Sequence, residues 1–208
     1  MRRKRSVEIT GCLDEAGQTH YDTCELFLKF AIAIYIVRMI AGVVNIVYAG
    51  LQPDVAITEK GGYWVFDLLV GTSRISPDYL PAGTQIIDNR VLTIGFLLTA
   101  MAVNFTPMLF VMNYIRNILR TIDNSHSPFV PEVVSNIRKA GRTLILIGVF
   151  SKLILKIMLQ LLACHSLYSF GIPDDLQLSW IFAGVIVLLV SDIFRRGCEL
   201  QQFSDETL

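Results

Sequence analysis

The stretch VLTIGFLLTAMAVNFTPMLFVM, from Val91 to Met112, decides the fold because it contains no charged side chain. About 20 mostly apolar residues in a helix are enough to cross the ~30 Å hydrocarbon core of a membrane. Asn104 and Pro107 are the two members that do not suit a plain apolar helix. The stretch therefore predicts a transmembrane helix.

Three more stretches are of similar length and mostly apolar, although each carries at least one charge. They are residues 26–49, 143–164 and 178–194. The whole chain agrees with this pattern, because 53% of its 208 residues are hydrophobic and only 17% are charged. A soluble domain is about one quarter charged. We therefore predict an all-α membrane protein with four transmembrane helices, and the composition disfavours an ordinary soluble enzyme.

Basic residues predict how these helices are oriented. The first 25 residues, the connection 114–142 and the C-terminal end together carry eleven Lys or Arg side chains, whereas the two other connections carry three. Lys and Arg are enriched in cytoplasmic loops, so both termini are predicted to be cytoplasmic. Residues 1–25 are expected to form a basic and polar tail that includes Arg2–Arg5. The apolar run begins well after this cluster, which favours a retained anchor over a cleaved signal peptide.

The connection between the first two helices, residues 50–90, contains an apolar and aromatic segment bounded by glycines. This segment is GGYWVFDLLVG, from Gly61 to Gly71, and it is too short to cross a membrane. Its composition predicts an ordered extracytoplasmic loop in which a strand or a β-hairpin packs on the outer mouth of the helices. A re-entrant segment is the alternative.

The connection 114–142 predicts a helical extension and a second, separate helix. Apolar residues at helical spacing carry the second transmembrane helix past the membrane face, and residues 123–128 then break it. Pro131 suits the first turn of a new helix. The residues that follow predict a short amphipathic helix lying on the membrane surface.

Charged side chains inside the predicted helices are candidates for a binding site. Each costs about 2.5–3.5 kcal/mol at the centre of a transmembrane helix, so it normally faces the protein interior or water. Lys152 and Lys156 lie four residues apart and share one helix face. A depth count predicts an ion pair between Lys152 and Asp192, and it places Arg38 and Lys156 at one depth. Those two cations indicate an anionic ligand, a lipid headgroup or a water-filled cleft. The alternatives are snorkelling to the interface, contacts with backbone carbonyls, or a membrane helix shorter than the predicted stretch.

Several kinds of site are not predicted. The four cysteines form no C-x-x-C pair, and the three histidines lie in three different regions, so no metal or cofactor is expected. The sequence has no H-E-x-x-H, no G-x-S-x-G and no glycine-rich phosphate loop, so no enzyme activity is expected. Lys and Arg balance Asp and Glu at eighteen each, which argues against direct binding of nucleic acid through a globally basic surface.

Two regions carry a resemblance to a known family. They are LRTIDN (119–124), followed by Pro128-Phe129 and NIRKAG (136–141), and the C-terminal DIFRRG (192–197), followed by ELQ (199–201). The chain resembles, over roughly residues 26–208, the bacterial integral membrane family catalogued as domain of unknown function 2975. The resemblance implies a multi-pass protein of the bacterial inner membrane. It also implies a partnership with a small helix-turn-helix regulator, which members of that family accompany.

The first functional hypothesis is a non-enzymatic regulatory or docking protein for a cytosolic partner. The candidate docking residues are Arg116, Arg120, Pro128, Phe129, Arg138, Lys139, Arg195, Arg196, Gly197 and Gln201. The alternative is a small transporter, a channel subunit or a membrane protein that binds an anionic ligand or lipid, using Arg38, Lys152, Lys156 and Asp192. Four helices enclose only a thin pathway, so transport would require a homo-oligomer. Membrane lipids are expected partners under both hypotheses.

Overall fold

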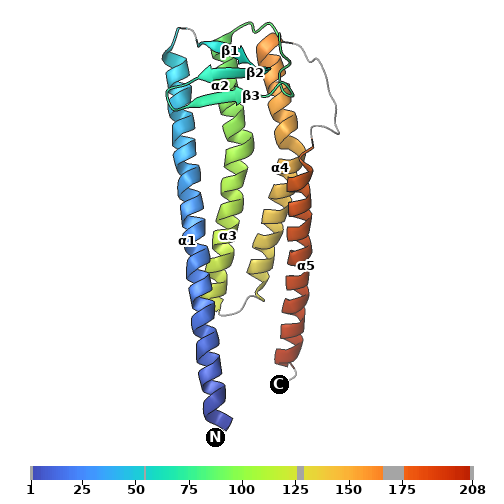
Figure 1. Cartoon of the computed structure of the whole chain (residues 1–208). Helices are drawn as coiled ribbons and strands as arrows, with labels where there is room; N and C mark the ends of the chain where they lie inside the picture. Colours follow the sequence, from blue (N-terminus) through green and yellow to red (C-terminus); the bar gives the residue numbers. More distant parts are fainter. Residues whose placement is uncertain (1, 54, 126–128, 166–175, 207–208) are drawn as a thin grey trace.

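The computed structural model describes residues 2–53, 55–125, 129–165 and 176–206, with side chains from residue 23 onward except at 204 and 205 (Figure 1). Within these residues, four helices are long and apolar enough to cross a membrane, which confirms the number predicted from the sequence. Their spans are Thr23–Leu51, Asn89–Ser125, Pro131–Cys164 and Leu178–Phe203.

Five α-helices and one π-helix make up the bundle. They are α1 (Arg2–Leu51), α2 (Asn89–Ala100), the π-helix η1 (Met101–Phe105), α3 (Thr106–Ser125), α4 (Pro131–Cys164) and α5 (Leu178–Glu206). Figure 1 shows a small β-sheet at one end of the bundle, which we call the sheet end. Helix α1 begins and α5 ends at the opposite end, which we call the terminal end.

Helices α1 and α4 are longer than the transmembrane stretches predicted within them. The predicted tail and the first span form one helix, Arg2–Leu51. Helix α4 begins at Pro131, whose fixed φ suits a first helical turn, and continues without a break to Cys164. The prediction of a separate short helix on the membrane surface is therefore wrong. The reason is that the buried face that starts at Val133 continues at helical spacing through Gly141 into the membrane stretch, so no residue ends the helix.

Helices α2, η1 and α3 form one rod in which η1 interrupts the α-helical hydrogen bonding. Pro107 has no N–H to give to the carbonyl of Val103, and a proline ring clashes with that carbonyl in a regular α-helix. Directly before the proline, the N–H of Thr106 reaches Met101 in an i to i+5 hydrogen bond. The hydroxyl of Thr106 donates to the same oxygen at 3.1 Å. The π-turn thus accommodates the proline inside an apolar stretch.

Helix α4 is the centre of the bundle. In its most apolar window 44% of the residues are buried, against 6–11% in the corresponding windows of the other three spans. Helices α3 and α5 both pack on it, and glycines allow α5 to come very close. A Cβ atom on Gly184 of α5 would lie 2.8 Å from the carbonyl oxygen of Gly141 on α4. Small residues at such a contact let two membrane helices pack backbone to backbone.

Helix α5 is displaced along α4 toward the terminal end. Gln177, just before α5, donates its N–H to the carbonyl of Gly148, halfway along α4, at 2.9 Å. Near the other end of the contact, the hydroxyl of Ser191 donates to the carbonyl of Val134 at 3.2 Å. Helix α5 therefore packs against the first half of α4, and its last turns extend beyond the start of α4 (Figure 1).

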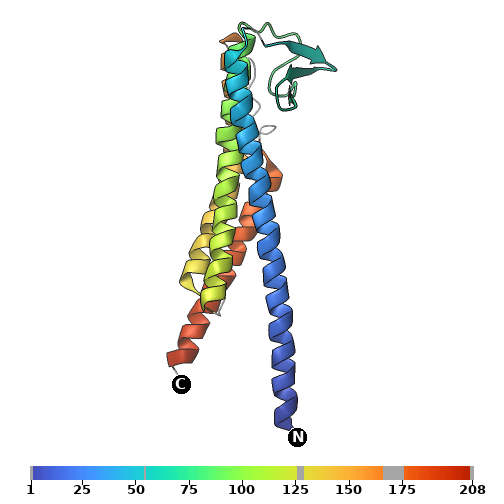
Figure 2. The same cartoon turned by 90° about the vertical axis from the view of Figure 1, so that its left-hand side faces the viewer.

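The connection between α1 and α2 forms an antiparallel sheet in the order β1 (Ile57–Lys60), β2 (Tyr63–Asp67) and β3 (Thr72–Ile75). The first turn is Gly61-Gly62, and both glycines adopt positive φ, as a two-residue hairpin requires. The segment thus forms a β-hairpin, and a third strand is added to it. Figure 2 shows the sheet projecting to one side of the bundle.

The sheet is attached to the helices by apolar packing and by hydrogen bonds. Trp64, Phe66 and Ile75 belong to one buried cluster, together with Leu92 of α2 and three residues of α4. Asn45 of α1 binds both backbone groups of Val70 in the β2–β3 turn. Its Nδ2 donates to the Val70 carbonyl at 3.2 Å, and its Oδ1 accepts from the Val70 N–H at 2.9 Å. The sheet is therefore joined to α1, α2 and α4.

Candidate functional site

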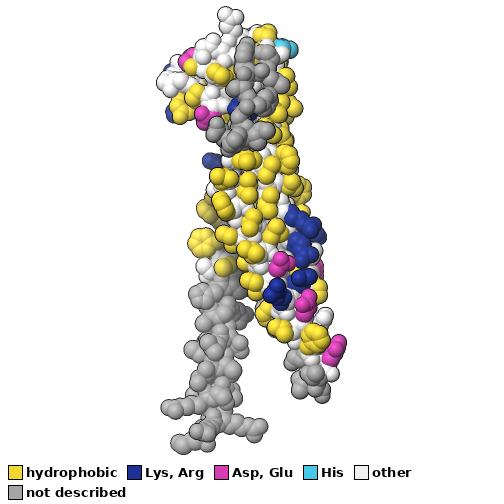
Figure 3. Space-filling view, turned by 90° about the vertical axis from the view of Figure 1, so that its right-hand side faces the viewer, with side chains coloured by type: hydrophobic (Ala, Val, Ile, Leu, Met, Phe, Trp, Pro, Cys, Tyr) yellow, Lys and Arg dark blue, Asp and Glu magenta, His cyan; other side chains and the backbone are white. Residues whose placement is uncertain are grey.

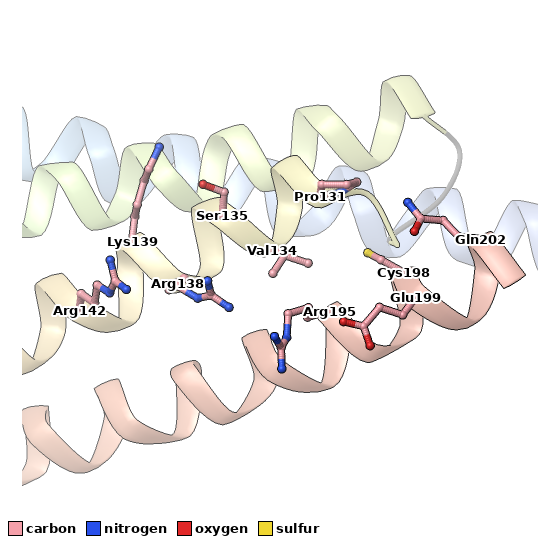
Figure 4. Close-up of a pocket in the computed structure, with 10 residues that line it drawn as sticks. All are labelled: Pro131, Val134, Ser135, Arg138, Lys139, Arg142, Arg195, Cys198, Glu199 and Gln202. Atoms are coloured by element: carbon pink, nitrogen blue, oxygen red, sulfur yellow. The ribbon is translucent and has the colours of Figure 1, made fainter.

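A pocket of about 430 Å³ lies between the first half of α4 and the last turns of α5, at the terminal end. We call it the basic pocket because most of its charged residues are cations. Its lining residues are Pro131, Val134, Ser135, Arg138, Lys139, Arg142, Arg195, Cys198, Glu199 and Gln202 (Figure 4).

Helical spacing brings these side chains to one place. On α4, Ser135, Arg138 and Arg142 are separated by three and four residues, which places them on one side of the helix. On α5, Arg195 and Glu199 are four residues apart and lie on the part of the helix that runs beside the start of α4 (Figure 4). The lining contains four cations and one carboxylate. The pocket therefore presents a positive potential to any group that enters it.

The floor of the pocket is buried because it belongs to the contact between the two helices. Val134 and Cys198 are 7% and 8% exposed, and Ser191 donates to the Val134 carbonyl. In contrast, Arg142 and Arg195 are exposed. Figure 3 shows Lys and Arg side chains gathered on this face of the molecule, in its lower half.

Phe129 and Gly197 form a contact beside the pocket. A Cβ atom on Gly197 would lie 2.4 Å from the ring of Phe129, so the absence of a side chain leaves room for the ring. The ring of Phe129 also packs on Phe194, with 5.7 Å between the ring centroids. This contact holds the start of α4 against α5.

Asp192 pairs with a different cation from the predicted one. Its Oδ1 lies 3.6 Å from Nη2 of Arg138, and both side chains are partly exposed. The predicted ion pair with Lys152 is therefore wrong. The depth count assumed that all helices begin and end at the same two membrane faces. Instead, α5 is displaced along α4, and this displacement brings Asp192 opposite the N-terminal turns of α4. An exposed pair of this kind contributes at most about 1 kcal/mol.

The predicted docking residues do not all lie in one place. Arg116 and Arg120 on α3 act electrostatically on the carboxylate of Glu25 in α1, which also pairs with Lys29 at 2.8 Å. Of the others, Arg138, Lys139 and Arg195 line the basic pocket. Arg196 and Gln201 are exposed on α5 but do not line it. Pro128 lies outside the described residues.

The predicted cations inside the membrane helices are not at one height. Tyr35, one turn before Arg38, shares a small cavity with Ile147 of α4. Arg38 lies three residues beyond Tyr35 and Lys156 lies nine residues beyond Ile147, both toward the sheet end, so the two cations differ by about 9 Å along the helices. Arg38 is exposed, whereas Lys156 is only 7% exposed and Lys152 is half-buried. The structure therefore does not bring Arg38 and Lys156 together at one depth.

Sequence reasoning missed several residues of the basic pocket. Ser135, Arg142 and Cys198 line it, and none of them was a docking candidate. Their helical spacing was visible within each helix. What could not be seen was which part of α5 faces which part of α4.

No group of three or more potential metal ligands occurs among the described residues. Cys24 and Cys198 are free thiols. Comparison of the chain with protein-family models, with curated proteins and with solved structures found no match.

Proposed function

We propose that this is a multi-pass membrane protein that docks and regulates a cytosolic partner, and that the basic pocket is the docking site. In this proposal both termini are cytoplasmic. The distribution of Lys and Arg supports that orientation, since eleven lie toward the terminal end and three in the two other connections. The basic pocket then opens at the cytoplasmic end of the bundle.

The convergence of four cations from two helices is the observation that supports docking. Arg138, Lys139, Arg142 and Arg195 surround one pocket whose only lining carboxylate is Glu199. Complementary charge steers association and selects partners. A partner with an acidic surface segment matches this pocket, and its binding weakens as salt screens the charges.

The fold also supports regulation from the other side of the membrane. Helix α4 takes part in both regions, since Leu155 and Leu159 pack against the sheet while Arg138 lines the basic pocket. A ligand or force that moves the sheet relative to α1 thereby also bears on α4. We propose that α4 transmits this change to the docking site as a rigid element.

The resemblance described above suggests the identity of the partner. We propose a bacterial inner membrane as the location and a small helix-turn-helix DNA-binding regulator as the partner. The protein itself acts without chemistry of its own in this proposal.

The test is purification of the tagged protein from its native membrane in mild detergent, followed by quantitative mass spectrometry. We expect a DNA-binding protein at near-equal amounts. The double variant Arg138→Glu/Arg195→Glu is expected to lose it, while Lys60→Glu/Arg74→Glu, with the same charge change in the sheet, is expected to retain it. Absence of a stoichiometric partner, or a partner retained by the pocket variant, would contradict the proposal.

A second candidate function has one observation in its favour, the burial of Lys156 inside the apolar part of α4. A small transporter or anion-binding protein would use this cation and Lys152. Cysteine introduced at Lys156, in a background without native cysteines, is then expected to react with an aqueous thiol reagent faster than cysteine at the neighbouring Leu155. Equal and slow labelling at both positions would count against this function.

A further inference from the structure

A groove of about 360 Å³ lies on the other side of α4, where it faces η1 and the start of α3. We call it the apolar groove. Its lining residues are Ala102, Val103, Pro107, Thr143, Leu146, Ile147, Phe150, Ser151 and Ile154.

The π-turn accounts for the position of the apolar groove. The wider turn of η1 and the ring of Pro107 depart from the regular helical surface that would otherwise pack on α4. Ala102 adds only a methyl group to the same wall. Deviations of this kind are often found at functional sites.

The lining of the groove is apolar enough to bind a hydrocarbon chain. Seven of its nine lining residues are apolar, and Leu146 and Phe150 at its rim are 56% and 46% exposed. Both lie in a helix that is long and apolar enough to cross a membrane, so acyl chains surround them there. The hydroxyl of Ser151, only 1% exposed, has no hydrogen-bond partner among the described residues.

Two cations, Lys139 and Arg142, lie at one end of the groove. Thr143 lines the groove and directly follows Arg142, and its hydroxyl donates to the carbonyl of Lys139 at 2.9 Å. Both cations are exposed, and Lys139 points away from α5 (Figure 4). Two cations that line the basic pocket therefore lie next to one end of the apolar groove.

The dimensions match one leaflet of a membrane. From Arg142 to Ile154 is twelve residues, or about 18 Å of helix. Half of the ~30 Å hydrocarbon core is about 15 Å. The site thus carries positive charge at headgroup level and apolar surface from there to the middle of the membrane.

We infer that this site binds one anionic phospholipid. The phosphate lies between Lys139 and Arg142, and one acyl chain follows the groove past Ala102 to Ile154. Basic pockets between transmembrane helices on the cytoplasmic side recognise such headgroups. This inference goes beyond docking and needs no protein partner, because it depends only on α4 spanning a membrane with Lys139 and Arg142 at the headgroups.

The test is native mass spectrometry of the purified full-length protein in detergent, titrated with phosphatidylglycerol or with phosphatidylcholine of the same chains. We expect one phosphatidylglycerol to bind more tightly than phosphatidylcholine. Inorganic phosphate at equal concentration is expected not to displace it, because phosphate alone cannot occupy the groove. Equal affinity for the two lipids, or displacement by phosphate, would overturn the inference.

Two pairs of variants separate the two halves of the site. Lys139→Gln/Arg142→Gln is expected to weaken phosphatidylglycerol binding about 30-fold, from the typical attraction of two cations to an anionic membrane. Arg116→Gln/Arg120→Gln removes the same charge from α3 and is expected to have no effect. No difference between these variants would refute the role of the two cations.

The groove is tested independently of charge. Ala102→Phe fills it and is expected to abolish tight lipid binding although both cations remain. Ala33→Phe makes the same change at an exposed alanine of α1 and is expected to bind lipid normally. Tight binding by both variants would overturn the acyl-chain assignment. If Ala102→Phe fails to fold, the exposed cation variants decide the matter, and neither result depends on whether a cytosolic partner is found.

Discussion

Replacing Gly184 with alanine adds one methyl group at the closest approach of α4 and α5. The new Cβ would lie 2.8 Å from the Gly141 carbonyl oxygen and 2.6 Å from Cγ1 of Ile145. The carbonyl belongs to a helix backbone and cannot rotate away as a flexible side chain would. Restoring an ordinary contact distance of 3.4 Å requires the two helices to separate by about 0.6 Å.

That separation sets the expected loss of stability. A gap of 0.5–1 Å already forfeits a quarter to a half of the dispersion energy of a packed contact. Overpacking of a close contact typically costs about 1–3 kcal/mol. Gly50→Ala is the matched control, because a Cβ there meets nothing within 4 Å and the substitution carries the same change in helix propensity.

We expect Gly184→Ala to be less stable than Gly50→Ala by about 1–3 kcal/mol. The assay is reversible unfolding in mixed micelles titrated with a denaturing detergent, with helicity followed by circular dichroism. A difference below about 0.5 kcal/mol would refute the reasoning, because it would mean that α4 and α5 do not approach backbone to backbone.

Two further changes test contacts on either side of the bundle. Asn45→Ala removes both hydrogen bonds to Val70, and we expect it to lower the free energy of unfolding by about 1–3 kcal/mol. Hydrogen exchange is expected to become faster in the β2–β3 turn and to stay the same in α5. Unchanged exchange in that turn would contradict the attachment of the sheet to α1. A double-mutant cycle between Asp192 and Arg138 is expected to give a coupling energy of up to about 1 kcal/mol. A cycle between Asp192 and Lys152 is expected to give none. A coupling energy that is larger with Lys152 than with Arg138 would support the pairing that the depth count predicted.

The basic pocket shows how a site can be partly visible in a sequence. Arg138, Lys139 and Arg195 were docking candidates because they are basic and flank predicted transmembrane helices. The separation of Arg116 from them was not predictable, since every basic residue in the connection counts equally in a topology argument. Only the packing of α3 shows that Arg116 faces α1 and not the pocket.

The four long apolar helices were determined by the sequence alone, because crossing a membrane depends on the length and polarity of one local stretch. The β-hairpin was predictable for a similar reason, since two adjacent glycines and the short apolar, aromatic run that follows them act locally. Pro107 was visible as a residue that does not suit a plain apolar helix, but neither the π-turn nor the groove against α4 was predicted from it.

The tertiary structure alone decided how the helices are placed along one another. Hydropathy shows which residues of a helix are apolar, but sliding one apolar helix along another leaves its hydropathy unchanged. That sliding is limited by a few close contacts, such as Gly184 on Gly141 and the hydrogen bond from Gln177 to Gly148. These contacts join residues far apart in the chain. Because of these contacts, Asp192 lies beside Arg138 and not beside Lys152. The same contacts place α5 next to the cations of α4 that line the basic pocket.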